Sequence, residues 1–200
     1  MYFDAVILAG GRSSRLGGSP KAELIYEGET LLHRSIAAAR GARRIVVVGP
    51  EAHDLPPGVL SCREDPPFAG PAAAIAAGLA LLESPARPGD DAYVLVLACD
   101  MPRVADAVHA LLEALHGGDG VMAVSGDGRR QPLAGFYRTA VLERAVEEAA
   151  ARNALNHGSV FALLARLDVQ AVTVPAGSTD DVDTWDDAAA LGVDASNHPG

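Results

Sequence analysis

The chain is poor in aromatic residues and cysteine. Only 4% of its 200 residues are Phe, Trp or Tyr, so we expect a core built mainly from Ala, Val and Leu. Two cysteines, Cys62 and Cys99, are too few for a disulfide framework, which favours reduced thiols in the cytoplasm. No apolar run approaches the ~20 residues that span a bilayer. The N-terminus also lacks the basic and then apolar pattern of a signal peptide, so we expect no membrane association.

Positive charge is scarce as well. The chain has 16 Lys+Arg against 26 Asp+Glu, a formal net charge of −10. Nucleic-acid binding relies on a basic surplus that neutralises phosphates, so we expect no nucleic-acid partner. An anionic substrate would instead need a local cationic site. Arg12, Arg15 and Lys21 offer one, and Lys21 is the single lysine of the chain.

The order of apolar segments predicts an α/β fold. Continuous apolar runs predict strands at 5–8 and 45–48, and mainly apolar segments predict further strands at 59–62, which is the weaker signal, and at 93–97, 121–124, 133–137 and 169–174. Amphipathic or Ala-rich segments predict helices at 31–40, 71–82, 105–115, 141–152, 160–167 and 185–191. This alternation predicts a mostly parallel sheet covered on both faces, with a small antiparallel excursion over 126–137. We expect one domain over residues 1–191 and a flexible tail over 192–200.

Lys21 ends a glycine-rich loop that follows the first predicted strand. Residues 8–21 read LAGGRSSRLGGSPK. Glycines let backbone N–H groups approach an anion closely, and lysine adds a compact positive charge. Open α/β sheets bind ligands where their strands end. We therefore interpret the loop as a phosphate-binding element; the alternative is that Lys21 is a remnant of a base-composition bias.

Asp100 follows the strongest predicted strand, at 93–97, and lies within the segment ACDMP at 98–102. One carboxylate together with phosphate oxygens is a usual way to hold Mg²⁺. The alternative is that Asp100 caps the next helix. Its neighbour Cys99 is better interpreted as a small buried residue than as a nucleophile.

Two further acidic segments are candidate site elements. In DDVDTWDD, residues 180–187, Asp181 and Asp183 point the same way if the chain is extended. Thr184 and the acidic residue three positions on, Asp187, predict a capping box for the last helix. In REDPPFAGP, residues 63–71, Asp65 has the chemistry to accept hydrogen bonds from the N1–H and exocyclic amine of guanine, or it is a surface residue before a proline.

The glycine loop resembles the signature loop of nucleotidyltransferases. It matches L-A-G-G-x-S-x-R-x-G-x-x-x-K, and it is neither a Walker A loop nor a G-x-G-x-x-G motif. GRRQPLAGFYR at 128–138 and GSVFALL at 158–164 are similar to segments of the molybdenum cofactor guanylyltransferase family. The resemblance covers most of residues 5–191.

This resemblance implies a three-layer, Rossmann-like nucleotidyltransferase fold. The implied reaction transfers GMP from GTP to the phosphate of molybdenum-bearing molybdopterin and releases pyrophosphate. The implied cofactor is Mg²⁺, held by Asp100 and Asp183, with Asp181 as a weaker candidate. Other implied partners are molybdoenzymes or other cofactor-assembly proteins. The implied nucleotide-binding residues are Leu8, Ala9, Gly10, Gly11, Lys21, Gly49, Asp65 and Asp100, and the implied catalytic residues are Arg15, Lys21 and Asp100.

Three departures from the family pattern leave alternatives open. Pro20 stands where this branch often has Asp, Trp185 replaces the usual proline, and Gly49 stands where some members carry a nucleotide-contacting Asn. The base and acceptor therefore stay open: a cytidylyltransferase of the same cofactor and another NTP:phosphate nucleotidyltransferase are alternatives. A non-catalytic nucleotide-binding regulatory module is an alternative of a different class, which NTP binding without pyrophosphate release would support.

Overall fold

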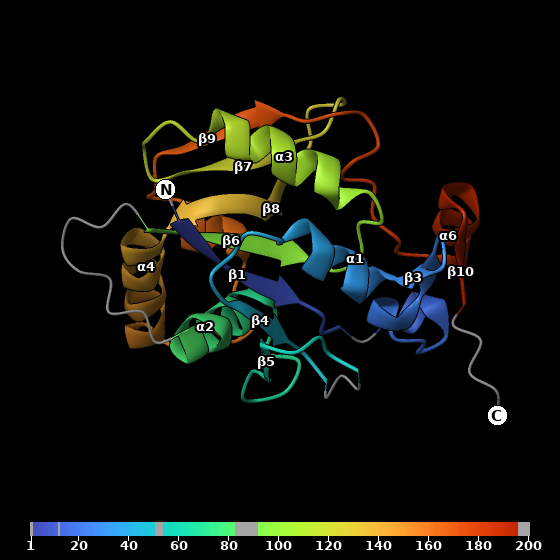
Figure 1. The fold of residues 1–200 in the computed structure, drawn as a ribbon. Helices are drawn as coiled ribbons and strands as arrows, with labels where there is room; N and C mark the ends of the chain where they lie inside the picture. Colours follow the sequence, from blue (N-terminus) through green and yellow to red (C-terminus); the bar gives the residue numbers. More distant parts are fainter. Residues whose placement is uncertain (1, 12, 51–53, 83–91, 196–200) are drawn as a thin grey trace.

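A seven-stranded sheet forms the centre of the described chain. The computed structural model describes residues 2–11, 13–50, 54–82 and 92–195, and its main sheet has the order β5-β4-β1-β6-β8-β7-β9 (Figure 1). These strands are β1 Tyr2–Leu8, β4 Ile45–Val48, β5 Val59–Cys62, β6 Ala92–Ala98, β7 Gly120–Val124, β8 Arg130–Arg138 and β9 Val169–Thr173. Strand β8 runs antiparallel to β6 and β7, whereas the other neighbours pair in parallel. The expected mostly parallel sheet with an antiparallel excursion is confirmed.

Helices cover both faces of this sheet, which gives three layers (Figure 1). One face is covered by α1 Leu31–Ala38 and α3 Val104–Ala114, and the other by α2 Pro71–Leu82, α4 Thr139–Ala151 and α5 Val160–Leu164. Strand β1 contributes to both cores: Ile7 packs in the first, and Val6 and Leu8 pack in the second. A strand buried on both faces has a continuous apolar sequence, which is why these strands were predictable from the sequence.

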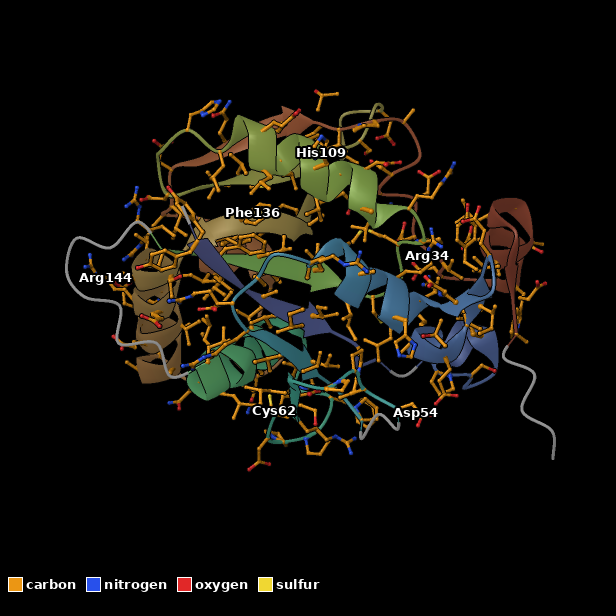
Figure 2. All side chains as sticks on the ribbon, in the orientation of Figure 1. Arg34, Asp54, Cys62, His109, Phe136 and Arg144 are labelled. Atoms are coloured by element: carbon orange, nitrogen blue, oxygen red, sulfur yellow. The ribbon has the colours of Figure 1, made fainter. Side chains whose placement is uncertain are left out.

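The cores contain few aromatic side chains, as expected. Phe136, labelled in Figure 2, extends from β8 into the first core, where its ring lies edge-on to Phe3 with centroids 5.1 Å apart and an interplanar angle of 85°. Most other core residues are Ala, Val, Leu or Ile. None of the described helices combines the length and the apolar character that a bilayer crossing requires.

A second, small sheet adds a third core near the carboxyl ends of β1 and β6 (Figure 1). Its strands are β2 Ile25–Tyr26, β3 Glu29–Thr30 and β10 Val193–Asp194, and it is accompanied by the short 3₁₀ helices η1 Ser14–Leu16 and η2 Lys21–Glu23 and by α6 Trp185–Leu191. The buried residues of this third core are Leu16, Leu24, Leu31, Val182, Ala188 and Val193. Strand β10 lies within the segment 192–200 that we expected to be a flexible tail. The rest of that segment, residues 196–200, lies outside the described residues, as do Arg12 and the connection 83–91.

Candidate active site

The glycine-rich loop leaves β1 beside the end of β4. The Ala9 N–H donates to Val48 O at 2.8 Å. A Cβ atom at Gly49 would lie 2.9 Å from both the carbonyl carbon of Ala9 and the nitrogen of Gly10, which is closer than real Cβ contacts. Glycine at this position therefore lets the start of the loop pack directly on the end of β4. A larger residue here would have to displace the loop backbone.

Two buried leucines fix the rest of the loop. Leu16, in η1, and Leu24, which follows η2, are each 1% exposed and belong to the third core. Around Leu16 the chain makes a tight turn in which Gly18 N–H donates to Ser13 O at 3.1 Å. Lys21 lies between these anchors, because η2 begins at Lys21 and Leu24 N–H donates to Lys21 O at 3.2 Å. The packing of nearby leucines thus sets the position of the lysine.

Lys21 bridges two carboxylates that come from distant parts of the chain. Its Nζ donates to Asp100 Oδ2 at 2.9 Å and to Asp183 Oδ1 at 2.5 Å. The side chain of Lys21 is 20% exposed. Burial alone would lower the pKa of Lys21, but the charges and hydrogen bonds of Asp100 and Asp183 outweigh it, so the net pKa shift is upward. Lys21 is therefore a full positive charge at neutral pH.

The acidic segment is attached to Asp100 through its backbone. Asp100 follows β6, and its carbonyl oxygen accepts a hydrogen bond from Val182 N–H at 3.0 Å. The Val182 side chain is fully buried in the third core. Asp181 and Asp183 flank this anchor, and one carboxylate oxygen of each lies within 4.8 Å of the others and of one from Asp100. The expectation that both aspartates face the same region is confirmed.

The start of α6 holds the same segment from the other side. Thr184 accepts a hydrogen bond from Asp187 N–H at 3.2 Å, and Asp187 Oδ2 accepts one from Thr184 N–H at 2.8 Å, so the predicted capping box is present. Asp187 Oδ2 also accepts from Asp183 N–H at 3.2 Å. The helix cap therefore also fixes the backbone of Asp183.

The three carboxylates fit a divalent cation. Burial raises the pKa of Asp181, and the neighbouring charges of Asp100 and Asp183 raise it further, while Arg129 opposes them. Oxygen-rich sets of this kind suit hard divalent cations. The Lys21 ammonium already lies between two of the three carboxylates, so the site accepts positive charge at this point. We conclude that Asp100, Asp181 and Asp183 are suited to hold such an ion.

Cys99, next to Asp100, is buried. Burial, followed by the charge of Asp100, raises the pKa of its thiol to about 12. The thiol is therefore neutral at physiological pH, which agrees with its interpretation as a small packing residue.

The other predicted residues lie around this centre. Arg15 lies at the rim, with its Nη1 3.8 Å from Asp183 Oδ2 and its side chain 73% exposed. Asp65 lies beyond the end of β5 and is exposed. The structure thus brings Arg15, Lys21, Asp100 and Asp183 together, with Gly49 beneath the loop, and leaves Asp65 at the end of a neighbouring strand.

Sequence reasoning missed Glu64, the neighbour of Asp65. Glu64 is 7% exposed, and its Oε1 accepts a hydrogen bond from Phe68 N–H at 3.0 Å. A Cβ atom at Gly10 would lie 3.8 Å from this same oxygen, so Glu64 lies against the glycine loop. Its Oε2 is buried, and the described residues offer it no hydrogen-bond partner. Glu64 closes the turn that follows β5, and thereby positions Asp65. The only sequence signal for the position of Glu64 was an acidic pair at the end of a predicted strand.

A mostly parallel sheet with a glycine-rich loop, a lysine and carboxylates at its carboxyl edge is the arrangement of a nucleotidyltransferase. The chain belongs to the MobA-like NTP transferase domain family, whose model matches residues 5–172. A probable molybdenum cofactor guanylyltransferase of Rhodopirellula baltica is 32% identical over 196 residues, covering 90% of this chain and 86% of the relative. A molybdenum cofactor guanylyltransferase of Sinorhizobium fredii is 33% identical over 144 residues, covering 70% of this chain and 65% of that protein.

Solved structures share the fold. The molybdopterin-guanine dinucleotide biosynthesis protein A of Archaeoglobus fulgidus has a TM-score of 0.67 at 19% identity and covers 94% of this chain and 96% of its own. The 2-C-methyl-D-erythritol 4-phosphate cytidylyltransferase of Francisella tularensis has a TM-score of 0.73 at 15% identity and covers 96% of this chain and 99% of its own. At these identities the likeness establishes the fold alone. The expected family, fold and enzyme class are confirmed.

Proposed function

We propose that this enzyme transfers GMP from GTP to the phosphate of molybdenum-bearing molybdopterin and releases pyrophosphate. The observation that carries the proposal is the position of Lys21, which brings the glycine-rich loop together with Asp100 and Asp183. The names of the relatives at 32% and 33% identity favour GTP and a molybdopterin acceptor. On this proposal, residues 1–191 act as one domain, to which β10 adds a further strand.

The glycine-rich loop, its two cations and Asp65 have separate roles in binding the nucleotide. The backbone of Leu8, Ala9, Gly10 and Gly11 frames the nucleotide, and Gly49 supports that backbone from below. Arg15 and Lys21 hold the β- and γ-phosphates and stabilise the departing pyrophosphate, because both cations lie at the loop. Asp65 accepts hydrogen bonds from the N1–H and exocyclic amine of guanine.

The cation on this proposal is Mg²⁺. Asp100 and Asp183 would hold it, with Asp181 beside them, and when bound it would offset the charge of the phosphates. The acceptor phosphate attacks the α-phosphorus, and the bond from that phosphorus to the bridging oxygen of pyrophosphate breaks. The acceptor phosphate is already ionised near neutral pH, so the chain needs no general base. Catalysis is then mainly positioning and charge stabilisation.

The direct test is pyrophosphate release from GTP with molybdopterin as acceptor and Mg²⁺ present. Lys21→Ala and Asp100→Ala should each lose about 10²–10³-fold in kcat, as expected for a preorganised electrostatic group. Arg152→Ala is the matched control, because Arg152 lies on the surface after α4 and pairs with Glu148 at 3.7 Å. Near-normal turnover in both site variants would overturn the assigned roles.

The same assay decides among the alternatives. A panel of GTP, CTP, ATP and UTP separates a guanylyltransferase from a cytidylyltransferase, and other phosphate monoesters test the acceptor. Tight GTP binding without pyrophosphate release would favour a regulatory module. We further propose that the enzyme works in the cytoplasm and passes its product to molybdoenzymes or other cofactor-assembly proteins.

A further inference from the structure

A polar hollow opens next to Asp181, one of the three carboxylates. It has a volume of about 290 Å³ and lies between the β7–β8 turn and the loop that follows β9. Arg129 and Gln131 line it from the first side, and Thr179, Asp180 and Asp181 line it from the second. Asp181 belongs both to this lining and to the carboxylate group. The hollow therefore adjoins the candidate active site at Asp181.

The backbone that carries Arg129 is well fixed. Asp127 Oδ1 accepts hydrogen bonds from Ser125 Oγ at 2.6 Å and from Arg129 N–H at 3.1 Å. The Ser125 N–H donates in turn to Arg129 O at 3.0 Å. Further along β8, the buried Tyr137 hydroxyl donates to Pro132 O at 2.6 Å, next to the irregular pairing of β7 with β8. These contacts fix the shape of the hairpin that carries Arg129.

The Arg129 side chain, in contrast, is weakly held. Its Nη2 lies 3.8 Å from Asp181 Oδ2, and the side chain is 62% exposed. Ion pairs with such exposure and distance contribute little to stability. Arg129 can therefore exchange Asp181 for a better partner. A phosphate is such a partner, because the planar guanidinium binds two of its oxygens at once.

A second arginine near the hollow has a different role. Arg103 lies 3.7 Å from Asp180, measured from Nη2 to Oδ2. A Cβ atom at Gly177 would lie 2.5 Å from the same Nη2, so the 177 backbone packs closely on the guanidinium. Arg103 thus supports the loop wall, whereas Arg129 lines the hollow itself.

We infer that this hollow receives the phosphate monoester acceptor and that Arg129 binds the acceptor phosphate. The inference rests on the proposed function and names the acceptor subsite of that same site. Two anions must meet in the reaction, and each then has its own cation: Lys21 on the nucleotide side and Arg129 across the carboxylates. The hollow lies at the lower limit of small-molecule pockets, about 300 Å³. It therefore holds the phosphate and the adjoining part of the acceptor rather than a whole nucleotide.

The test compares Arg129→Ala, Arg129→Lys and the control Arg130→Ala. Arg130 is exposed and lies outside the lining of the hollow. In Arg129→Ala, the KM for molybdopterin should rise roughly 10-fold or more, the size of a lost charge-assisted hydrogen bond. The KM for GTP should stay unchanged. Arg129→Lys should recover part of the loss, and Arg130→Ala should match the wild type. An unchanged KM for molybdopterin in Arg129→Ala, or an equal rise in the KM for GTP, overturns the inference.

Calorimetric binding of molybdopterin separates this inference from the proposed function. If the wild type binds molybdopterin, Arg129→Ala binds it roughly 10-fold more weakly and no GMP is transferred, the proposed function fails and the subsite stands. If GMP is transferred but both proteins bind molybdopterin equally, the subsite fails and the proposed function stands. If the wild type does not bind molybdopterin at all, both are overturned.

Discussion

At the residue scale, Lys21 is a single reporter for the whole site. It is the one lysine in the sequence, so protein labelled with ¹⁵N and ¹³C in lysine gives one side-chain ammonium signal. Burial alone would lower the pKa of Lys21, but Asp100 and Asp183 raise it above 10.5. We therefore predict that an NMR titration of this signal gives a pKa above 10.5.

The upward shift of the Lys21 pKa has a consequence for the stability of the fold. A lysine with a raised pKa in the folded state stabilises the fold fully below the unfolded value of 10.5, and this contribution is lost as the pH rises through the folded pKa. The control is Asp183→Asn, in which the Lys21 pKa should fall because one partner charge is gone. A wild-type pKa below 10.5, or no change in Asp183→Asn, would contradict the geometry.

The sequence predicted which residues matter in this loop, but not their partners. The glycines and Lys21 form a local pattern, whereas Asp100 and Asp183 are 79 and 162 positions away from Lys21. Such pairs depend on tertiary packing, which no local pattern contains. The same limit applies to Glu64 and Asp65. Two adjacent carboxylates look alike in the sequence, and only the fold shows that Glu64 is buried and Asp65 exposed.

At the element scale, the start of α6 links helix stability to the position of Asp183. Thr184→Ala removes the hydroxyl that accepts from Asp187 N–H. We predict a loss of about 1 kcal/mol of stability, the usual value for a threonine N-cap, which corresponds to a fall in Tm of about 2–4 °C for a chain of this size. Thermal unfolding followed by circular dichroism measures it.

Ser159→Ala is the matched control for this cap. Ser159 is the N-cap of α5, and its side chain makes no capping hydrogen bond. Its replacement should therefore leave Tm nearly unchanged. Equal shifts in both variants would show that the capping box of α6 contributes nothing specific to stability.

Elements with long apolar patterns were the predictable ones. Strand β4 begins and ends where the sequence predicts, because a strand covered by helices on both faces is apolar throughout and stops where that run stops. Strand β5 also has the predicted bounds, although it lies at the edge of the sheet and is only partly buried. The small sheet was missed. Its strands β2, β3 and β10 have two residues each, too few to show an alternation. These strands are held in place by the third core, which packs residues 16–31 against residues 182–193.

At the scale of the whole molecule, topology brings dispersed acidic residues to one place. Asp100 follows β6, and the segment with Asp181 and Asp183 lies beyond β9. Val182 connects them, because its N–H binds Asp100 O and its side chain fills the third core. The fold thus holds like charges together in a chain that already has a net charge of −10. Lys21 offsets part of the repulsion among these carboxylates, and the remainder costs stability until a further cation binds.

The variant Asp181→Asn tests whether the clustered carboxylates lower the stability of the fold. Burial and then the charges of Asp100 and Asp183 raise the Asp181 pKa above 3.8, so the folded state holds this proton more tightly than the unfolded state does. Wild-type stability from this group is therefore present below pH 3.8 and is lost as the pH rises through the folded pKa. Without added metal, we predict that Asp181→Asn raises Tm at neutral pH by about 2 °C, and that this difference disappears in acid.

Added metal should have the opposite effect on Tm: it should stabilise the wild type more than Asp181→Asn. A cation that binds the folded state raises Tm by mass action, and Asp181→Asn removes one of its three carboxylates. Added Mg²⁺ should therefore raise the Tm of the variant less than that of the wild type. Asp194→Asn controls for the loss of one negative charge, because Asp194 is the exposed residue of β10, and this variant should match the wild type in both conditions. If Asp194→Asn stabilised the protein as much as Asp181→Asn, the gain would come from net charge, and the three carboxylates would not form a repulsive cluster.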